Sequence, residues 1–330
     1  MKWSALIGGA FGLGLAAWLL ASYGIQQIFD LLRSAGWFGF LAVIASHIVQ
    51  ILFSTMGWRT ITGPTEPRPG IGRYFLLRAI REAVNNLLPV AQIGGQVVTT
   101  RLLQQRGVKL APAIAGTVAD LTLEVVTQVA FTLLGLVLLL KTVGDGGIAG
   151  YVISGLLGAA ALVAFMLTAQ WLGLAAAIEK GLMRLGQSMG WAGTANVEGL
   201  HKALIACYRA PGRVLSAGFW HLSCWLLGGV EVCVALHFLG HDVGIVPGLI
   251  IESLGQALKS VGFAVPGALG VQEGGYIVIC QVLGLSPEVA IALSLMKRLR
   301  EVALGIPGLI LWQRTEAKAA APARSISEMT

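Results

Sequence analysis

Apolar segments long enough to cross a membrane alternate with short polar connections along most of the chain. Residues 3–22 and 34–58 contain no charged side chain, and about 20 apolar residues suffice to cross the hydrocarbon core of a bilayer. Similar segments at 110–140, 148–174, 214–238 and 287–313 predict further crossings. The sequence therefore predicts an all-α polytopic membrane protein with about six full transmembrane helices.

Two further apolar segments contain helix breakers and polar side chains. The first reads EAVNNLLPVAQIGGQVVTTR at 82–101, and the second reads AVPGALGVQEGGYIVICQVLGL at 264–285. Glycine alone often serves close helix packing, but each segment joins a proline to a pair of adjacent glycines. Irregular backbone at membrane depth survives only where protein or a water-filled cavity surrounds it. Both segments therefore indicate a polar site inside the bundle.

Basic residues are concentrated in alternate connections. Several basic residues lie in each of the connections 57–82, 101–109 and 175–213 and in the tail after 313. The only basic residues in the remaining connections, 23–33, 141–147 and 239–247, are Arg33 and Lys141. Cytoplasmic loops are enriched in Lys and Arg, so both termini are predicted to be cytoplasmic. Both flanks of 83–100 are basic, which predicts either a re-entrant segment or a two-span helical hairpin over 73–103.

The two broken segments belong to a weak internal repeat. An ungapped shift of 177 residues aligns 89–125 with 266–302 and gives nine identities, among them Pro89 with Pro266 and Glu124 with Glu301. The predicted orientation makes 110–140 and 287–313 cross in opposite directions. Inverted repeats with broken segments at matching positions are typical of transporters. The pattern predicts repeat 1 at about 72–140 and repeat 2 at about 248–313.

The remaining boundaries follow from charge and periodicity. Residues 175–210 carry apolar side chains at helical spacing between charges, which predicts two interfacial helices. We expect 1–313 to form a single transmembrane domain and 314–330 a disordered cytoplasmic tail.

Composition supports a membrane protein and excludes several other classes. Hydrophobic residues make up 56% of the 330 residues and charged residues only 12%, against about 25% charged residues in soluble domains. The net charge of +7 resides in membrane connections, so we expect no nucleic-acid partner. The four cysteines show no CxxC spacing, and we find no ATPase or hydrolase motif. We therefore expect no catalytic residues, metal or cofactor, and we interpret His47 and His221 as packing groups.

Four basic residues, Arg81, Arg101, Lys259 and Arg298, are candidates to bind a phosphate, since arginine suits bidentate contact with phosphate. Polar and breaking residues of the broken segments, together with Arg101, are the candidate lipid-contacting groups. They are Asn85, Asn86, Pro89, Gln92, Gly94, Gly95, Gln96, Arg101, Pro266, Gln272, Glu273, Gly274 and Gly275.

Charged residues in or beside the apolar segments are the candidate gating and ion-pairing groups. Asp120 and Glu124 share one helix face, and we expect them to pair with the basic cluster at the matching positions of the second repeat. The set comprises Arg81, Glu82, Asp120, Glu124, Lys259, Lys297, Arg298, Arg300 and Glu301.

These features resemble the flippase-like membrane domain of the lysylphosphatidylglycerol synthase family. The resemblance is carried by REAVNNLLPVAQIGGQVVTTRLL at 81–103, DLTLE at 120–124, and FAVPGALGVQEGGYIVICQVLGL at 263–285 with ALSLMKRLRE at 292–301. The segment FWHLSCWLLGGVEVCVALHFLGH at 219–241 is similar to the branch found beside hopanoid-biosynthesis genes. The resemblance implies lipid handling in the bacterial cytoplasmic membrane. Larger relatives carry an aminoacyltransferase domain after the membrane part, whereas this chain ends at Thr330, so we expect no synthase activity.

We therefore predict a lipid translocase that moves a polar-headed lipid, with hopanoids as the expected class, between leaflets. The alternative is a non-transporting accessory factor of hopanoid or aminoacyl-lipid biosynthesis, which would partner the biosynthetic enzymes. An intramembrane enzyme centred on Glu273 is a third reading.

Overall fold

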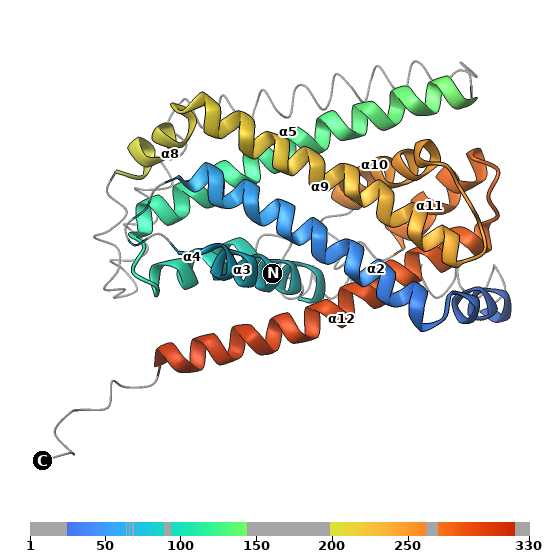
Figure 1. Ribbon diagram of the computed structural model, residues 1–330, viewed down its shortest axis with the longest axis horizontal. Coiled ribbons are helices and arrows are strands. Elements are labelled where there is room, and N and C mark those ends of the chain that lie inside the picture. Colours follow the sequence, from blue (N-terminus) through green and yellow to red (C-terminus); the bar gives the residue numbers. More distant parts are fainter. Residues whose placement is uncertain are drawn as a thin grey trace, which may run out of the picture.

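The computed structural model describes residues 25–63, 65, 67, 69–88, 94–143, 199–261 and 270–320. The predicted crossings 3–22 and 148–174 lie outside these residues, as does most of the predicted interfacial segment 175–210. The described residues form helices and connections without strands (Figure 1). The helices are α2 (Ile25–Thr62), α3 (Ile71–Leu87), α4 (Gly94–Gln104), α5 (Leu110–Val143), α8 (Leu200–Tyr208), α9 (Pro211–Phe238), α10 (Ile245–Val261), α11 (Val271–Val282) and α12 (Pro287–Ala320).

Three of the described helices are long and apolar enough to cross a bilayer. They are Phe29–Thr62 within α2, α5 and α9, and they contain the predicted crossings 34–58, 110–140 and 214–238. Large apolar side chains such as Trp37, Phe38 and Phe219 are exposed on α2 and α9, as expected of surfaces that face lipid. The protein is therefore a membrane protein.

Helices α2 and α9 form an antiparallel pair through the bundle. A methyl group added at Gly39 would meet Phe238, and one added at Gly57 would meet His221, so the two backbones lie close together along their length. Helix α2 kinks at Gly36, whose φ of +58° is readily adopted only by glycine.

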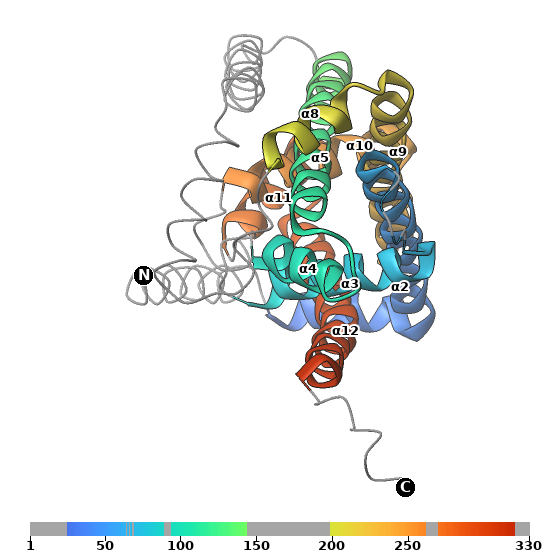
Figure 2. The same ribbon diagram turned by 90° about the vertical axis from the view of Figure 1, so that its left-hand side faces the viewer.

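The two ends of the bundle differ in which helices begin there. At end A, on the left of Figure 1, α2 and α12 finish and α5 and α9 begin. There Gly63 lies against Arg213, and Gln105 donates to Glu316 near the end of α12. At end B, α2 and α12 begin and α5 and α9 finish. Figure 2 views the bundle from end A.

Helices α3 and α4 form a hairpin that enters and leaves at end A. Gly95 in α4 lies against the carbonyl of Arg81 and the side chain of Asn85 in α3, so α4 starts beside the last turns of α3. At about 1.5 Å per residue, α3 is about 25 Å long and α4 about 17 Å. Both are shorter than the hydrocarbon core of about 30 Å. The predicted segment 83–100 is thus divided between two short helices.

Helices α10 and α11 form a second hairpin at end B. Gly255 in α10 lies against Tyr276 in α11, and Gly275 lies against Leu258. Leu283 and Leu285, just after α11, pack against the buried cluster that contains Leu239 at the end of α9. The second broken segment, 264–285, thus contains α11, while α10 precedes it.

The helices form two sets, α3 to α5 and α10 to α12, and the corresponding helices of the two sets have matching lengths. Helices α3 and α10 each have 17 residues, and α5 and α12 each have 34 residues. Helices α5 and α12 begin at residues 110 and 287, a difference of 177 that equals the offset found in the sequence. Helix α12 continues to Ala320, so residues 314–320 are helical instead of forming part of a disordered tail.

Each hairpin packs against the long helix of the other set. Helix α3 lies antiparallel to α12, because Gly305 meets Leu87 and Gly308 meets Ala83. Helix α10 lies antiparallel to α5, where Gly135 meets Ser253. Since α5 begins at the end where α12 finishes, the two long helices run in opposite directions.

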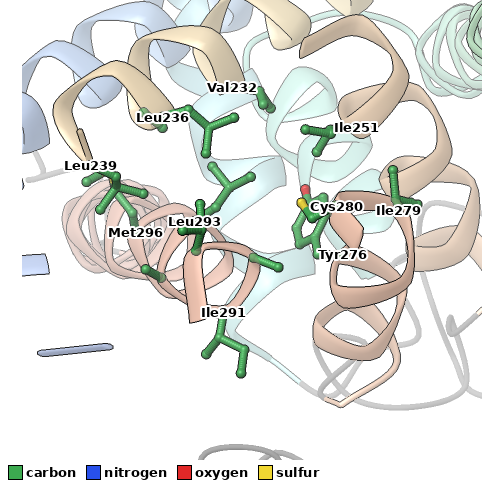
Figure 3. Close-up of a cluster of buried hydrophobic side chains, with 14 of the residues drawn as sticks. Val232, Leu236, Leu239, Ile251, Tyr276, Ile279, Cys280, Ile291, Leu293 and Met296 are labelled. Atoms are coloured by element: carbon green, nitrogen blue, oxygen red, sulfur yellow. The ribbon is translucent and has the colours of Figure 1, made fainter. Parts of the chain in front are cut away.

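Three buried apolar clusters hold this arrangement together. The largest lies toward end B and joins α9, α10, α11 and α12 (Figure 3). A second joins α5, α8 and the end of α2, and a third surrounds Trp58 and Tyr74, whose rings meet edge to face.

Replacing Gly308 by Ala tests the contact between α3 and α12. The added methyl would lie 2.6 Å from Ala83 Cβ and 3.1 Å from the carbonyl oxygen of Ala79, and neither atom can rotate away. Overpacking of this kind costs about 1–3 kcal/mol, so thermal unfolding in detergent should begin at a lower temperature.

Gly218→Ala on α9 is the control, because no atom lies within 4 Å of the new methyl group. It should not lower the unfolding temperature. Equal stability of the two variants would contradict the close packing of α3 on α12.

Candidate functional site: a buried charge network

The first part of the site joins α3, α5 and α9. Arg78 and Arg81 donate to Asp120 at 3.2 and 2.5 Å and to Glu124 at 2.8 Å each. His221 Nε2 lies 2.9 Å from the other oxygen of Asp120. Asp120 and His221 are fully buried. We call these five residues the α3–α5 cluster; its two arginines balance its two carboxylates.

The second part surrounds a histidine on α2. His47 Nε2 lies 3.1 Å from Glu82 on α3, and His47 Nδ1 lies 3.2 Å from Glu231 on α9. Arg300 on α12 approaches His47 Nδ1 at 2.7 Å and donates to Glu231 at 2.5 Å. Gln50 also donates to Glu231 at 2.5 Å. This His47 cluster therefore binds four helices to one another.

A buried ion pair joins the second hairpin to its own long helix. Lys297 on α12 donates to Glu252 on α10, and both side chains are almost completely buried. Gln256 donates to the second oxygen of Glu252 at 2.8 Å. The ammonium group of Lys297 also lies 6.0 Å from the ring centre of Tyr276 on α11.

The fourth part lies between α10, α11 and α12. Glu273 accepts hydrogen bonds from Arg298 at 2.8 Å and Ser294 at 3.2 Å. Lys259 donates to Glu301 at 2.7 Å, and Arg298 Nη1 lies 3.8 Å from Glu301. We call these residues the Glu273 cluster; its two cations balance its two carboxylates.

Ion pairs connect three of these four parts into one network. Arg78 lies 3.7 Å from Glu82, which joins the α3–α5 cluster to the His47 cluster. Arg300 lies 3.6 Å from Glu301, which joins the His47 cluster to the Glu273 cluster. A charge at the centre of a membrane helix costs about 2.5–3.5 kcal/mol on insertion scales. Mutual pairing is therefore what allows these helices to carry so many charges.

The pairing of Asp120 and Glu124 differs from the prediction. They bind Arg78 and Arg81 on α3, and not the basic residues of α12. The expectation of pairing between matching positions of the two repeats is therefore wrong. Spacing along a helix shows which side chains share a face, but not which helix that face meets.

The four proposed phosphate-binding cations all have carboxylate partners. Arg81, Lys259 and Arg298 pair within the network, and Arg101, which is well exposed, lies 3.2 Å from Glu316. A phosphate at any of these positions would have to compete with a carboxylate.

The predicted amides of the first hairpin hold its two helices together. Asn85 Nδ2 donates to Gln96 at 3.2 Å, and the Gly95 backbone N–H donates to Asn85 at 2.8 Å. Asn86 lies at the end of α3 and is half-buried. Gly94 begins α4, while Pro89 and Gln92 lie outside the described residues.

In the second hairpin, Glu273 caps its own helix. Its carboxylate accepts the Gly270 backbone N–H at 2.6 Å, which satisfies one of the free N–H groups at a helix start. Gln272 is buried, and its side-chain oxygen has no hydrogen-bond partner among the described residues. A methyl group at Gly274 would meet nothing within 4 Å, whereas one at Gly275 would meet Leu258. Pro266 lies outside the described residues.

Five charged residues or histidines of these four parts were missing from the predicted site. Each is a charge or a histidine within an apolar helix, or a basic residue in a stretch rich in basic residues, and this is the signal that could identify them. They are His47, Arg78, His221, Glu231 and Glu252.

A pocket of about 370 Å³ lies at end A, away from the hairpins. Its lining includes Lys109, Arg213 and Cys207 but none of the predicted site residues. Burial raises the pKa of the Cys207 thiol to about 11, so the thiolate that would act as a nucleophile is scarce near neutral pH. Among the described residues, no group of three or more His, Cys, Asp or Glu side chains could hold a metal ion.

The sequence matches one known family over most of its length. Residues 5–308 match the lysylphosphatidylglycerol synthase TM region, so the chain belongs to this family, which has a membrane lipid-related function. The resemblance to the broad family is confirmed, whereas the hopanoid branch stays a prediction. No curated protein and no solved structure matches the chain.

The buried pair of Lys297 and Glu252 should be strongly coupled in stability. Lys297→Met leaves Glu252 buried without its cation, and breaking a buried pair in this way costs about 3–5 kcal/mol. Adding Glu252→Gln to Lys297→Met should recover most of the lost free energy of unfolding. Unfolding in mixed detergent and dodecyl sulfate, applied to both single variants and the double variant, measures the coupling.

The control is the ion pair of Arg101, which is well exposed, with Glu316, which is partly exposed. Arg101→Met should change the free energy of unfolding by less than about 1 kcal/mol, as for other exposed ion pairs. Additive effects of Lys297→Met and Glu252→Gln would contradict the assignment of a coupled buried pair.

Proposed function

We propose that this protein is a lipid translocase that moves a polar-headed lipid between the leaflets of the cytoplasmic membrane without ATP hydrolysis. The observation that carries the proposal is the pair of short hairpins that enter the bundle from opposite ends. Because no helix of either hairpin is long enough to cross a bilayer, the inner ends of these helices lie within the bundle. Helix breaks at membrane depth are typical of transporter binding sites.

An inverted repeat accounts for this arrangement. The equal helix lengths, the offset of 177 residues, the opposite directions of α5 and α12 and the reciprocal packing of the hairpins all support it. The ion pairs support it as well. Arg78 pairs with Asp120, and Glu252 pairs with Lys297 at the matching helix positions with the signs reversed. Alternating access would then expose a shared midplane site to each end in turn.

The distribution of basic residues supports a cytoplasmic end A. Side chains near this end include Arg73, Arg106, Lys109 and Arg213, whereas Arg33 and Lys141 lie toward end B. Burial lowers the pKa of Arg106, and the like charge of Arg73 lowers it further to a smaller extent. Cytoplasmic connections are enriched in such residues, and both chain termini would then also be cytoplasmic.

The lipid headgroup would lie between the inner ends of the hairpin helices. Gln272 supports this position because it is buried and its side-chain oxygen lacks a partner among the described residues. A polyol headgroup, as in hopanoids, offers hydroxyl donors that such an oxygen can accept. The exposed apolar surfaces of α4 and α11, at Val97 and Val278, suit a lipid whose apolar body stays in the bilayer.

Gln272→Leu should slow lipid movement without lowering stability. The change removes a buried acceptor oxygen that has no partner among the described residues, so no hydrogen bond to this oxygen within the described structure is lost. Purified protein in vesicles carrying a fluorescent polyol lipid, with dithionite added outside, reports movement from the inner leaflet. Wild-type protein should expose the inner probe several-fold faster than protein-free vesicles, and Gln272→Leu should be slower.

Gln281→Leu on the same helix is the control, because Gln281 is exposed and should not affect the rate. No movement of this probe, or of labelled phosphatidylglycerol, by wild-type protein would contradict the translocase. If a deletion strain then lacked one lipid product, the alternative of a non-transporting accessory factor would be favoured.

A further inference from the structure

His47 is the only member of its cluster whose charge can change near neutral pH. Its ring lies between Glu82 on α3, Glu231 on α9 and Arg300 on α12. An arginine stays charged and carboxylates normally titrate well below pH 7, whereas histidine changes charge between about pH 5 and 8.

Two partners of opposite kind compete for one nitrogen of this ring. Arg300 Nη1 lies 2.7 Å from Nδ1 and can only donate, so it requires a lone pair on that nitrogen. Glu231 lies 3.2 Å from the same Nδ1 and can only accept, so it requires a proton there. Nε2 faces Glu82 in either case. Neutral His47 satisfies Arg300 and Glu82, whereas protonated His47 satisfies Glu231 and Glu82 and repels Arg300.

The local charge balance favours a proton at this site. The α3–α5 cluster has two cations and two carboxylates, as does the Glu273 cluster, and Lys297 balances Glu252. Around His47, however, Glu82 and Glu231 face the single cation Arg300. The four parts therefore hold seven carboxylates and six cations, and one proton on His47 would neutralise the difference.

The fully buried histidine, His221, lacks both features. Among the described carboxylates only Asp120 contacts His221, and Asp120 already accepts from Arg78 and Arg81. No cation competes for the ring of His221 in the described part of the chain, and its cluster is balanced without a histidine charge.

We propose that His47 is a proton-binding site whose occupancy drives the movement of α12 relative to α2, and thereby couples lipid movement to a proton gradient. Proton uptake converts the ring from an acceptor of Arg300 into a donor to Glu231. Arg300 then loses one of its two short contacts, and α12, which also carries Lys297 and Glu301, is freed to shift. Glu82 is about a quarter exposed, more than Glu231 or Arg300, and provides the route for the proton.

The proton site can be tested without any transport assay. Protein labelled with ¹⁵N-histidine in bilayers gives nitrogen spectra that distinguish neutral from doubly protonated rings, and His47→Gln identifies the signal of His47. We expect this ring to change from neutral to doubly protonated between about pH 8 and pH 5. Glu82→Gln should lower the midpoint, and Arg300→Gln should raise it, each by about one pH unit or more.

His237→Gln changes an exposed histidine outside the four parts of the site, so it is the control and should leave the midpoint of His47 unchanged. If Arg300→Gln fails to fold, Glu82→Gln still decides the test. Residue 82 is partly exposed, and the amide oxygen of the introduced glutamine can still accept a hydrogen bond from the ring of His47, so this variant should fold. The proton site would be overturned if the ring of His47 kept one protonation state across this pH range. It would also be overturned if Glu82→Gln left the midpoint of His47 unchanged.

The coupling of lipid movement to a proton gradient rests on the proposed translocase function, and the vesicle assay measures it separately. In the vesicle assay, a pH gradient should accelerate movement of the fluorescent polyol lipid by wild-type protein and by His237→Gln, an exposed control. The rate in His47→Gln should not respond to the gradient. Wild-type lipid movement that ignores the gradient would overturn the coupling but not the translocase. No lipid movement at all would overturn the translocase and with it the coupling, while the nitrogen spectra would still decide the proton site.

Discussion

A bilayer offers no water to polar groups, so every charge and every broken turn inside it must be satisfied by the protein itself. The helices of this protein meet that constraint by pairing their charges across helix boundaries. Arg78 and Arg81 bind α3 to α5, Lys297 binds α12 to α10, and Arg300 binds α12 to α9. Because none of these charges has a partner in lipid, each pair specifies which helices must be neighbours.

The same constraint explains how short hairpins can end inside the bundle. Each hairpin lies against the long helix of the other set and is tied by an ion pair to its own. Buried ion pairs contribute little net stability compared with apolar packing, but breaking one is costly. Such pairs suit a protein that exchanges between two arrangements, because each arrangement must satisfy all charges before it can be populated. A titratable group such as His47 can then bias the exchange.

The sequence predicted the elements of the fold better than their contacts. Breakers at Pro89 and Pro266 and the repeat offset indicated two interrupted segments, and hydropathy indicated the crossings in α2, α5 and α9. Arg78 and Arg81 belong to the stretch 57–82, whose many basic residues predict a cytoplasmic connection, but both side chains lie buried on α3. The pairing of Asp120 was also missed, because a one-dimensional pattern shows that a charge is buried but not which helix supplies its partner.

The most direct measurement of the central claim is the sidedness of the two hairpins. Cys207, Cys224, Cys233 and Cys280 would be replaced by Ala, and single cysteines introduced at the exposed positions Gln105 and Ser286, just after α4 and α11. A membrane-impermeant maleimide should then label these two positions from opposite sides of the membrane. Labelling of both from the same side would show that the hairpins do not oppose one another and would contradict the account.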